Sequence, residues 1–187
     1  MGSRIVVAED EPITRMDICE MLKTAGYSVV GEAANGLQAV ELCRIHRPEL
    51  VLMDIKMPKL DGIQASEILM KEDIAQSIIV LTAYSGKEFI DKVKTIGAIG
   101  YIVKPIDEVR LIPQVEIAIS KGQELKAMRN KLTSIKTICS AKELLMEKFR
   151  LSENEAYKKL RRMSMDKQTT IFQVSQNILE HNESLDI

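Results

Sequence analysis

The chain of 187 residues has little cysteine and no long apolar run, and no signal-peptide pattern is expected at its first residues. None of its apolar runs approaches the roughly 18 residues of a membrane-spanning helix, and residues 1–3 do not begin a signal peptide. We therefore expect a cytoplasmic protein without a membrane partner. Three cysteines, Cys19, Cys43 and Cys139, lie too far apart for a zinc-binding pattern. They are best interpreted as small apolar packing residues in a reducing compartment.

A net charge of −1 conceals an asymmetry between two parts of the chain. Residues 1–120 carry 13 Lys and Arg against 18 Asp and Glu, a net charge of −5, whereas residues 121–187 carry 13 against 9, a net charge of +4. An acidic module followed by a basic one suggests two separate roles, and the basic module suits a polyanionic partner. A solvated helical face would give the same positive excess.

Short apolar runs alternate with helical patterns in the first part of the chain. Such alternation is typical of an α/β domain whose parallel strands are joined by right-handed crossovers. The first helical pattern begins at Pro12 and carries Ile13, Met16, Cys19 and Leu22 at helical spacing. Five strands are predicted over residues 4–8, 28–33, 50–54, 77–82 and 99–103, with further helices from residue 35 and over 63–70, 87–96 and 109–119.

Four of these strands end in polar side chains at one edge of the predicted sheet. They are Glu9 and Asp10, then Asp54, Thr82 and Lys104. Crowded carboxylates repel one another unless a cation is present, and Mg²⁺ accepts carboxylate oxygens while it bridges to a phosphoryl oxygen. Lys104 adds a fixed positive charge and Thr82 a hydroxyl donor. This chemistry fits a carboxylate nucleophile, Asp54, that accepts a phosphoryl group. The alternative is that Asp54 only caps a turn.

These motifs resemble the receiver domain of two-component response regulators, over residues 4 to about 118. The family pattern is present as Glu9-Asp10-Glu11-Pro12, Met53-Asp54-Ile55-Lys56-Met57-Pro58, Asp61-Gly62, Leu81-Thr82-Ala83, Tyr101 and Lys104-Pro105. One departure is Glu9, because the family more often has Asp there.

The receiver resemblance implies a flavodoxin-like fold with the parallel strand order 2-1-3-4-5 and a sensor histidine kinase as partner. It implies that Asp54 is the phosphoacceptor, that Thr82 and Tyr101 form a switch pair, and that Lys104 contacts the phosphate. Magnesium would be bound by Glu9, Asp10, Asp54 and the backbone carbonyl of Lys56, and the bond before Pro105 would be cis. The chain would be no enzyme beyond autophosphorylation and slow dephosphorylation at Asp54. Taken singly, Thr82 and Tyr101 would also fit as ordinary strand and core residues.

A seven-residue apolar repeat follows the predicted sheet and indicates one long helix with a coiled-coil linker at residues 121–140. Gly122 lowers its helical stability by roughly 1 kcal/mol relative to alanine and is a candidate hinge. The seam either pairs two chains or packs on the last helices of the same chain. Its members are Ala118, Leu125, Leu132 and Cys139 at one heptad position, and Met128 and Ile135 at the other.

Two capping boxes indicate a small three-helix unit at the end of the chain. Ser152-x-x-Glu155 and Thr170-x-x-Gln173 each predict a helix start, after a helix that continues through residues 141–149. Tyr157 stands among basic residues, so it could stack on an unpaired base while Lys and Arg side chains bind phosphates. No short glycine-containing turn of the helix-turn-helix type is evident.

This unit resembles the ANTAR domain, an RNA-binding module of transcription antiterminators, over about residues 125–182. The matching segments are residues 141–146, 151–157 and 160–166, although the family often has Gly where Glu143 stands. The resemblance implies binding to paired RNA hairpins in a nascent leader transcript. The expected RNA contacts are Lys142, Tyr157, Lys158, Arg161, Arg162, Ser164 and Lys167.

The sequence therefore predicts a response regulator whose phosphorylation on Asp54 drives homodimerisation and RNA binding that prevents transcription termination. Its parts are a receiver at residues 1–120, a coiled-coil linker at 121–140 and a three-helix RNA-binding domain at 141–187. A DNA-binding response regulator and a protein-interaction adaptor are the alternatives. An output enzyme is not expected, because residues 120–187 hold no catalytic cluster beyond His181.

Overall fold

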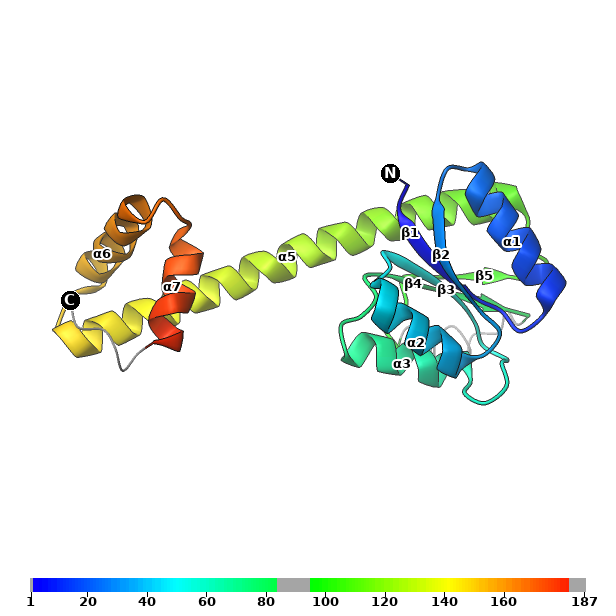
Figure 1. Cartoon of the computed structure of the whole chain (residues 1–187), viewed down its shortest axis with the longest axis horizontal. Helices are drawn as coiled ribbons and strands as arrows, with labels where there is room; N and C mark the ends of the chain where they lie inside the picture. The colour runs from blue at the N-terminus through cyan, green and yellow to red at the C-terminus, as the bar shows by residue number, and fades with distance from the viewer. Residues whose placement is uncertain (1, 84–94, 182–187) are drawn as a thin grey trace. The chain divides into compact units, whose positions relative to one another are not determined.

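The computed structural model describes residues 2–83 and 95–181 and contains a parallel sheet with helices on both faces (Figure 1). The pattern that predicts a helix over residues 87–96 falls mostly outside these residues. The strands are β1 (Arg4–Ala8), β2 (Ser28–Ala33), β3 (Leu50–Asp54), β4 (Ile78–Thr82) and β5 (Gly100–Val103). The helices are α1 (Pro12–Thr24), α2 (Gly36–His46), α3 (Gly62–Lys71), α5 (Glu108–Phe149), α6 (Glu153–Asp166) and α7 (Ile171–Glu180). Two compact units result, Met1–Lys126 and Ala127–Ile187.

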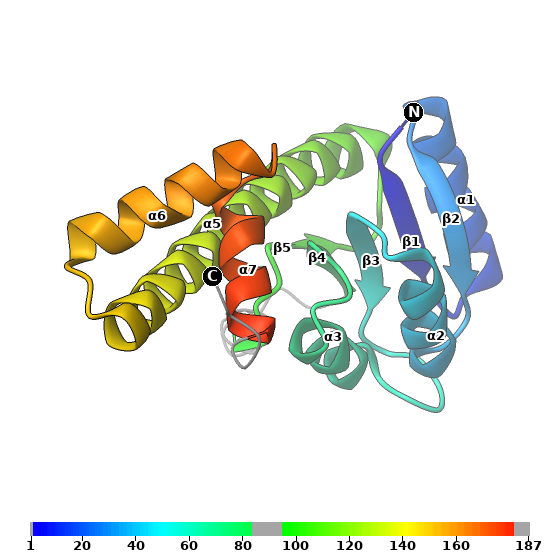
Figure 2. The ribbon, with the colours of Figure 1, turned by 60° about the vertical axis from the view of Figure 1, so that its left-hand side comes forward.

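The five strands run in the order β2-β1-β3-β4-β5 and every neighbouring pair is parallel. This confirms the flavodoxin-like fold predicted from the sequence. Strand β3 is buried along its whole length, because alternate side chains enter the cores on the two faces of the sheet. Val51 and Met53 pack with α2 and α3, whereas Leu50 and Leu52 pack with α1 and the first part of α5. Figure 2 shows these two pairs of helices on opposite faces of the sheet.

Helix α1 covers its face of the sheet with only part of the set that helical spacing selected: Cys19 and Leu22 are confirmed, and Ile18 is added. Ile18, Cys19 and Leu22 are buried, whereas Ile13 and Met16 are 67% and 60% exposed. The periodic pattern therefore identified the helix correctly but extended its inward face too far towards the N-terminus.

Helix α5 is anchored to the start of β4 near Gly122. A Cβ atom on Gly122 would lie 2.0 Å from the Ser77 Oγ and 3.2 Å from the Gln76 carbonyl oxygen. The Ser77 hydroxyl donates a hydrogen bond of 2.7 Å to the Ala118 carbonyl oxygen, one helical turn earlier. Since α5 continues through residue 122 without a break, this glycine permits close packing, and the sequence-based interpretation of a hinge is corrected.

The second unit packs the end of α5 against α6 and α7. Its core is small and apolar, and both predicted capping boxes are present, with Ser152 and Thr170 as the N-caps of α6 and α7. None of the described helices is long and apolar enough to cross a membrane. The core residues are Ala141, Leu145, Ala156, Leu160, Val174 and Ile178.

Candidate functional site

Parallel strands bring a group of polar side chains to one edge of the sheet. The register pairs Ala8 with Met53, Asp54 with Leu81 and Thr82 with Val103, so the carboxyl ends of four strands lie level. The residues predicted to meet at this edge are therefore the last residues of β3 and β4 and those that directly follow β1 and β5. They are Glu9, Asp10, Asp54, Thr82 and Lys104.

Lys104 lies between two buried carboxylates. Its Nζ donates hydrogen bonds to Glu9 Oε1 at 2.9 Å and to Asp54 Oδ2 at 3.1 Å, and it lies 2.7 Å from Glu9 Oε2. Glu9 is 0% exposed and Asp54 is 5% exposed. Asp54 Oδ1 accepts a hydrogen bond of 2.8 Å from the Ile55 backbone N–H. Unpaired buried charges are costly, so the lysine is required to hold the two acids together.

The ionisation of these groups follows from burial and pairing. Burial raises the pKa of the Glu9 carboxyl above its usual value; the hydrogen bond from Lys104 opposes this rise, and the negative charge of Asp54 adds to it. Burial lowers the pKa of Lys104, but hydrogen bonds to Glu9 and Asp54 outweigh burial, so the pKa is raised overall. Lys104 therefore keeps its positive charge at neutral pH.

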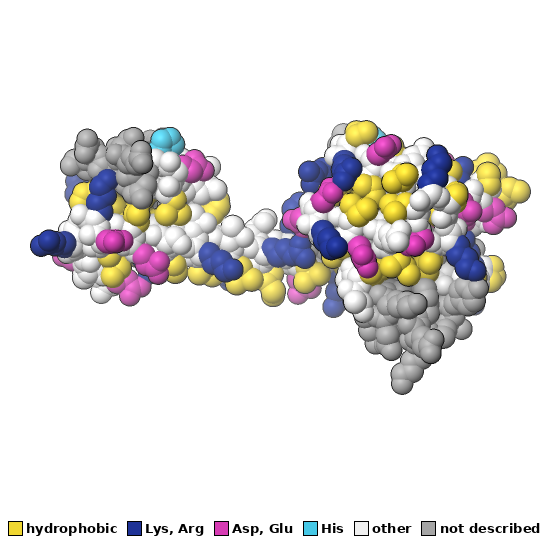
Figure 3. Space-filling model, turned by 90° about the horizontal axis from the view of Figure 1, so that it is seen from below, with side chains coloured by type: hydrophobic (Ala, Val, Ile, Leu, Met, Phe, Trp, Pro, Cys, Tyr) yellow, Lys and Arg dark blue, Asp and Glu magenta, His cyan; other side chains and the backbone are white. Residues whose placement is uncertain are grey.

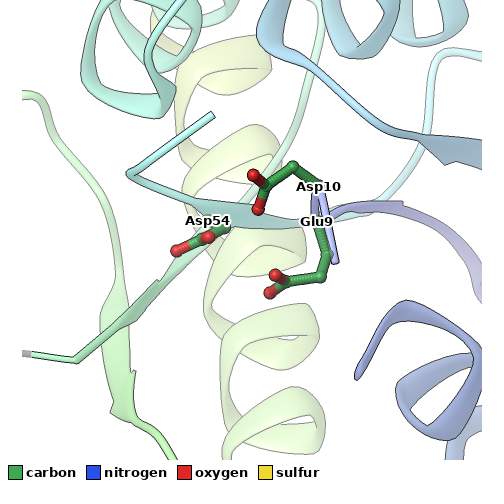
Figure 4. A group of neighbouring side chains, drawn as sticks. All are labelled: Glu9, Asp10 and Asp54. Carbon is green, nitrogen blue, oxygen red and sulfur yellow. The ribbon is translucent and has the colours of Figure 1, made fainter. Parts of the chain in front are cut away.

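A third carboxylate completes an arrangement that fits a divalent cation. Glu9, Asp10 and Asp54 each offer a carboxylate oxygen, and these oxygens lie within 4.8 Å of one another (Figure 4). Asp10 is exposed, which leaves one side of the group open to water. Magnesium prefers oxygen ligands and retains several waters, so this donor set suits it. Lys56, whose carbonyl was the fourth predicted ligand, lies in the bend directly after β3.

Two residues that shape this edge were not singled out as site residues by the sequence. Gly62 allows the loop after β3 to return against that strand, because a Cβ atom there would lie 1.9 Å from the Asp54 carbonyl oxygen. Arg15 Nη1 donates to the Glu9 carbonyl oxygen at 2.5 Å and approaches that of Asp10 at 3.5 Å. No local pattern identifies Arg15, because its role depends on how α1 packs beside β1.

The predicted switch residues occupy different environments. Thr82 is 1% exposed at the end of β4, whereas Tyr101 on β5 is 37% exposed. They lie on the neighbouring strands β4 and β5, and residues 84–94, between them in the sequence, are outside the described ranges.

The predicted RNA contacts divide into exposed and internal residues. Ser164 is 7% exposed and its hydroxyl donates to the Arg161 carbonyl oxygen at 2.7 Å. Lys142 is 17% exposed and pairs with Glu153 at 2.5 Å. Ser164 is therefore buried within α6, and the Lys142–Glu153 pair links α5 to α6. The exposed candidates, all on α6 or at its end, are Tyr157, Lys158, Arg161, Arg162 and Lys167.

Comparisons with known proteins agree with both parts of this description. The model of the response regulator receiver domain matches residues 5–116, and the model of the ANTAR domain matches residues 126–179. The transcriptional regulatory protein PdtaR of Mycobacterium tuberculosis is 40% identical over 184 residues, which cover 95% of this chain and 89% of that protein. The chemotaxis protein CheY of Thermotoga maritima is 38% identical over 112 residues, which cover 60% of this chain and 93% of that protein.

Solved structures match the sheet-containing part of the chain. A two-component response regulator of the LuxR family from Aurantimonas sp. SI85-9A1 superimposes with a TM-score of 0.61 at 32% identity, covering 65% of this chain and 87% of that one. The receiver domain of the putative response regulator NarL from Mycobacterium tuberculosis gives a TM-score of 0.61 at 26% identity, covering 64% and 97%.

Proposed function

Because the chain belongs to the response regulators that join a receiver domain to an ANTAR domain, we propose that phosphorylation of Asp54 controls its dimerisation and its binding to hairpin RNA. The family supports the coarser description, a two-component response regulator with an RNA-binding antiterminator role. The observation that carries the proposal is the pairing of Asp54 with Lys104 beside two further carboxylates. We place the protein in the cytoplasm, where its kinase and nascent transcripts are accessible.

The phosphoryl step uses the Asp54 carboxylate as the nucleophile. An oxygen of Asp54 attacks the phosphorus of a phosphohistidine on a sensor kinase; the new P–O bond forms, the P–N bond breaks, and the histidine regains its neutral imidazole. Lys104, already 3.1 Å from Asp54, pairs with the added negative charge. Magnesium bound by Glu9, Asp10, Asp54 and the Lys56 carbonyl would neutralise the phosphoryl oxygens. Water then hydrolyses the acyl phosphate slowly: a new P–O bond to water forms, the P–O bond to Asp54 breaks, and inorganic phosphate and the free carboxylate result. We propose no other chemistry.

The change would then reach the rest of the receiver through Thr82 and Tyr101. Thr82 stands at the end of β4, level with the acidic edge, and its hydroxyl suits a phosphoryl oxygen as a hydrogen-bond donor. Tyr101 is partly exposed on the neighbouring strand and can change its packing without entering the core. We propose these two as the switch pair.

Dimerisation would use the apolar seam on α5. Leu125, Met128, Leu132 and Ile135 are 47–58% exposed on one side of the helix, and the described part of α6 and α7 does not cover them. Apolar residues spaced alternately three and four residues apart form a continuous stripe that can pack along its whole length only against another helix with the same repeat. A second copy of α5 meets this condition, so the seam packs between chains in our proposal.

The RNA face would lie on α6. Tyr157 is 45% exposed and Arg161 follows it one turn later, so a base can stack on the ring while the guanidinium contacts a phosphate. Lys158, Arg162 and Lys167 add exposed positive charge. Ser164 and Lys142 are left out of this face because of their internal contacts. Two copies held together raise the effective concentration of the second module once one hairpin is bound.

A gel shift with leader RNA tests the proposal, with and without the phosphate mimic beryllofluoride. We expect the mimic to tighten binding by the native protein and to have no effect on Asp54→Ala. Arg161→Glu should abolish the shift, whereas Lys71→Glu makes the same change of charge on an exposed residue of α3 and should leave it intact.

Each other outcome contradicts a defined part of the proposal. Binding that tolerates Arg161→Glu would rule out the α6 face, and equal affinity with and without the mimic would rule out the switch. A shift of duplex DNA with indifference to hairpin RNA would favour a DNA-binding regulator. Failure to bind either nucleic acid would favour a protein-interaction adaptor.

A further inference from the structure

The positive charge of the second part of the chain is concentrated on α5. Residues 121–140 contain five Lys and Arg residues and one Glu, which gives this stretch of α5 a net charge of +4. Residues 141–187, which include the three-helix unit, contain eight of each sign and are neutral overall. The excess that suits a polyanion therefore lies on the linker helix, next to the apolar seam and not on α6.

Two of these linker lysines lie beside the seam. Lys131 precedes Leu132 and Lys136 follows Ile135, so their side chains flank the apolar stripe on opposite sides, and both are exposed. Among the described residues neither lysine has an ion-pair partner. Figure 3 shows basic side chains beside hydrophobic ones along this exposed part of α5.

Heptad geometry brings like charges together when two copies pair. In a parallel, in-register coiled coil a residue at one flank faces the residue five places later on the other chain. Lys131 would face Lys136 of the partner subunit, a repulsive pair that occurs twice. Glu124 would face Arg129 of the partner subunit, an attractive pair one heptad earlier. In the dimer, Lys131 and Lys136 would therefore face each other with no acidic side chain opposite them to neutralise their charge.

We propose that this basic edge of α5, Lys131 and Lys136 of both chains, contacts the phosphate backbone of the RNA that the three-helix units hold. The inference rests on the proposed function and adds a second RNA-contacting surface to it. RNA phosphates would neutralise the repulsive pairs, so RNA binding would strengthen dimerisation and dimerisation would strengthen RNA binding by the same factor. Phosphate contacts carry no base sequence, so this surface adds affinity and salt dependence without specificity.

Lys131→Glu tests the proposal because it should move two measurements in opposite directions. Without RNA, the repulsive pair becomes attractive twice per dimer, and sedimentation velocity should show a dimer tighter by roughly 4- to 30-fold. With RNA, each dimer loses two phosphate contacts, so the slope of log K against log salt should become shallower by about 1.5. The RNA probe is a synthetic pair of stem-loops joined by a short unpaired spacer, measured by fluorescence anisotropy in the presence of beryllofluoride.

Lys126→Glu is the matched control, because Lys126 is exposed on the same helix but points away from the seam. It should leave the dimer affinity unchanged and reduce the salt slope less than Lys131→Glu. If both variants change RNA binding equally, net charge alone explains the effect and the proposal is wrong. Equal dimer affinity for Lys131→Glu and the native protein would also overturn it.

The test separates this inference from the proposed function. If the native protein binds the probe in an Arg161-dependent way while Lys131→Glu keeps the native salt slope, the linker contact is refuted and RNA binding by α6 stands. If the native protein binds no RNA even at low salt, both are refuted. If polyglutamate competes with the RNA probe at equal charge concentration, the basic edge is assigned to an acidic polypeptide instead of RNA, and the proposal that it contacts RNA is wrong.

Discussion

Gly122→Ala is expected to destabilise the receiver unit even though alanine is the better helix former. Propensity alone would stabilise α5 by about 1 kcal/mol. The added Cβ, however, would lie 2.0 Å from the Ser77 Oγ and 3.2 Å from the Gln76 carbonyl oxygen, and Ser77 is 1% exposed. Overpacking of a filled interior costs roughly 1–3 kcal/mol, and displacing the buried Ser77 hydrogen bond costs about 1 kcal/mol more. The free energy of unfolding should fall by roughly 1–3 kcal/mol.

A double-mutant cycle isolates the clash as the cause. Ser77→Ala removes the Oγ atom that the new Cβ would meet, and by itself it should cost about 1 kcal/mol for the lost hydrogen bond to Ala118. In the double variant the gain in helix propensity offsets that loss, so its stability should return to within about 1 kcal/mol of the native protein. Urea unfolding of the full chain, followed by circular dichroism, gives all four values. An increase in stability for Gly122→Ala alone would refute the close packing and would favour a flexible site.

Three further predictions test other parts of the structure. If α5 pairs in parallel and in register, the exposed Cys139 should form an interchain disulfide with diamide on a non-reducing gel, and Cys139→Ser should abolish it; Cys43, buried with a pKa raised to about 12, should not react. Folding raises the pKa of Glu9 above 4.5, so the contribution of Glu9 to the free energy of unfolding is full below pH 4.5 and is lost as the pH rises through the pKa of the folded state. When urea unfolding is measured in EDTA at several pH values, Glu9→Gln should abolish this loss of stability with rising pH. Ser152→Ala removes the N-cap of α6 and should destabilise the three-helix unit by about 1 kcal/mol in thermal unfolding. The same change at Ser140, which is exposed within α5 and caps no helix, should have little effect.

Local patterns predicted the elements of this chain, and packing decided which residues matter within them. The apolar run of β3 identified a doubly buried strand because both faces of a parallel sheet are covered. The two capping boxes identified helix starts because their hydrogen bonds are made within four residues. The exposure of Ile13 and Met16 could not be predicted, since it depends on how α1 lies over its neighbours.

The acidic edge was predictable as a gathering of residues but not as a geometry. Strand ends supplied Glu9, Asp54 and Lys104 because parallel strands align their carboxyl ends. The sequence did not show that Lys104 binds Glu9 and Asp54 directly, since those contacts join residues 95 and 50 positions apart. Nor did it show that Ser164 is internal, because a serine on a helix can face either solvent or core.

The continuity of α5 determines how a change at the receiver could reach the seam. Leu111 and Val115 lie in the receiver core, Ala118 accepts the Ser77 hydrogen bond, and the exposed seam begins at Leu125. All four belong to α5, which has no break at Gly122, so one hydrogen-bonded helix backbone joins the receiver core to the first seam residue. If the proposed switch acts through this helix, a hinge at Gly122 would weaken the coupling and close packing there would preserve it. We therefore expect a variant that loosens the packing at Gly122 to be phosphorylated normally yet to lose the response of RNA binding to beryllofluoride.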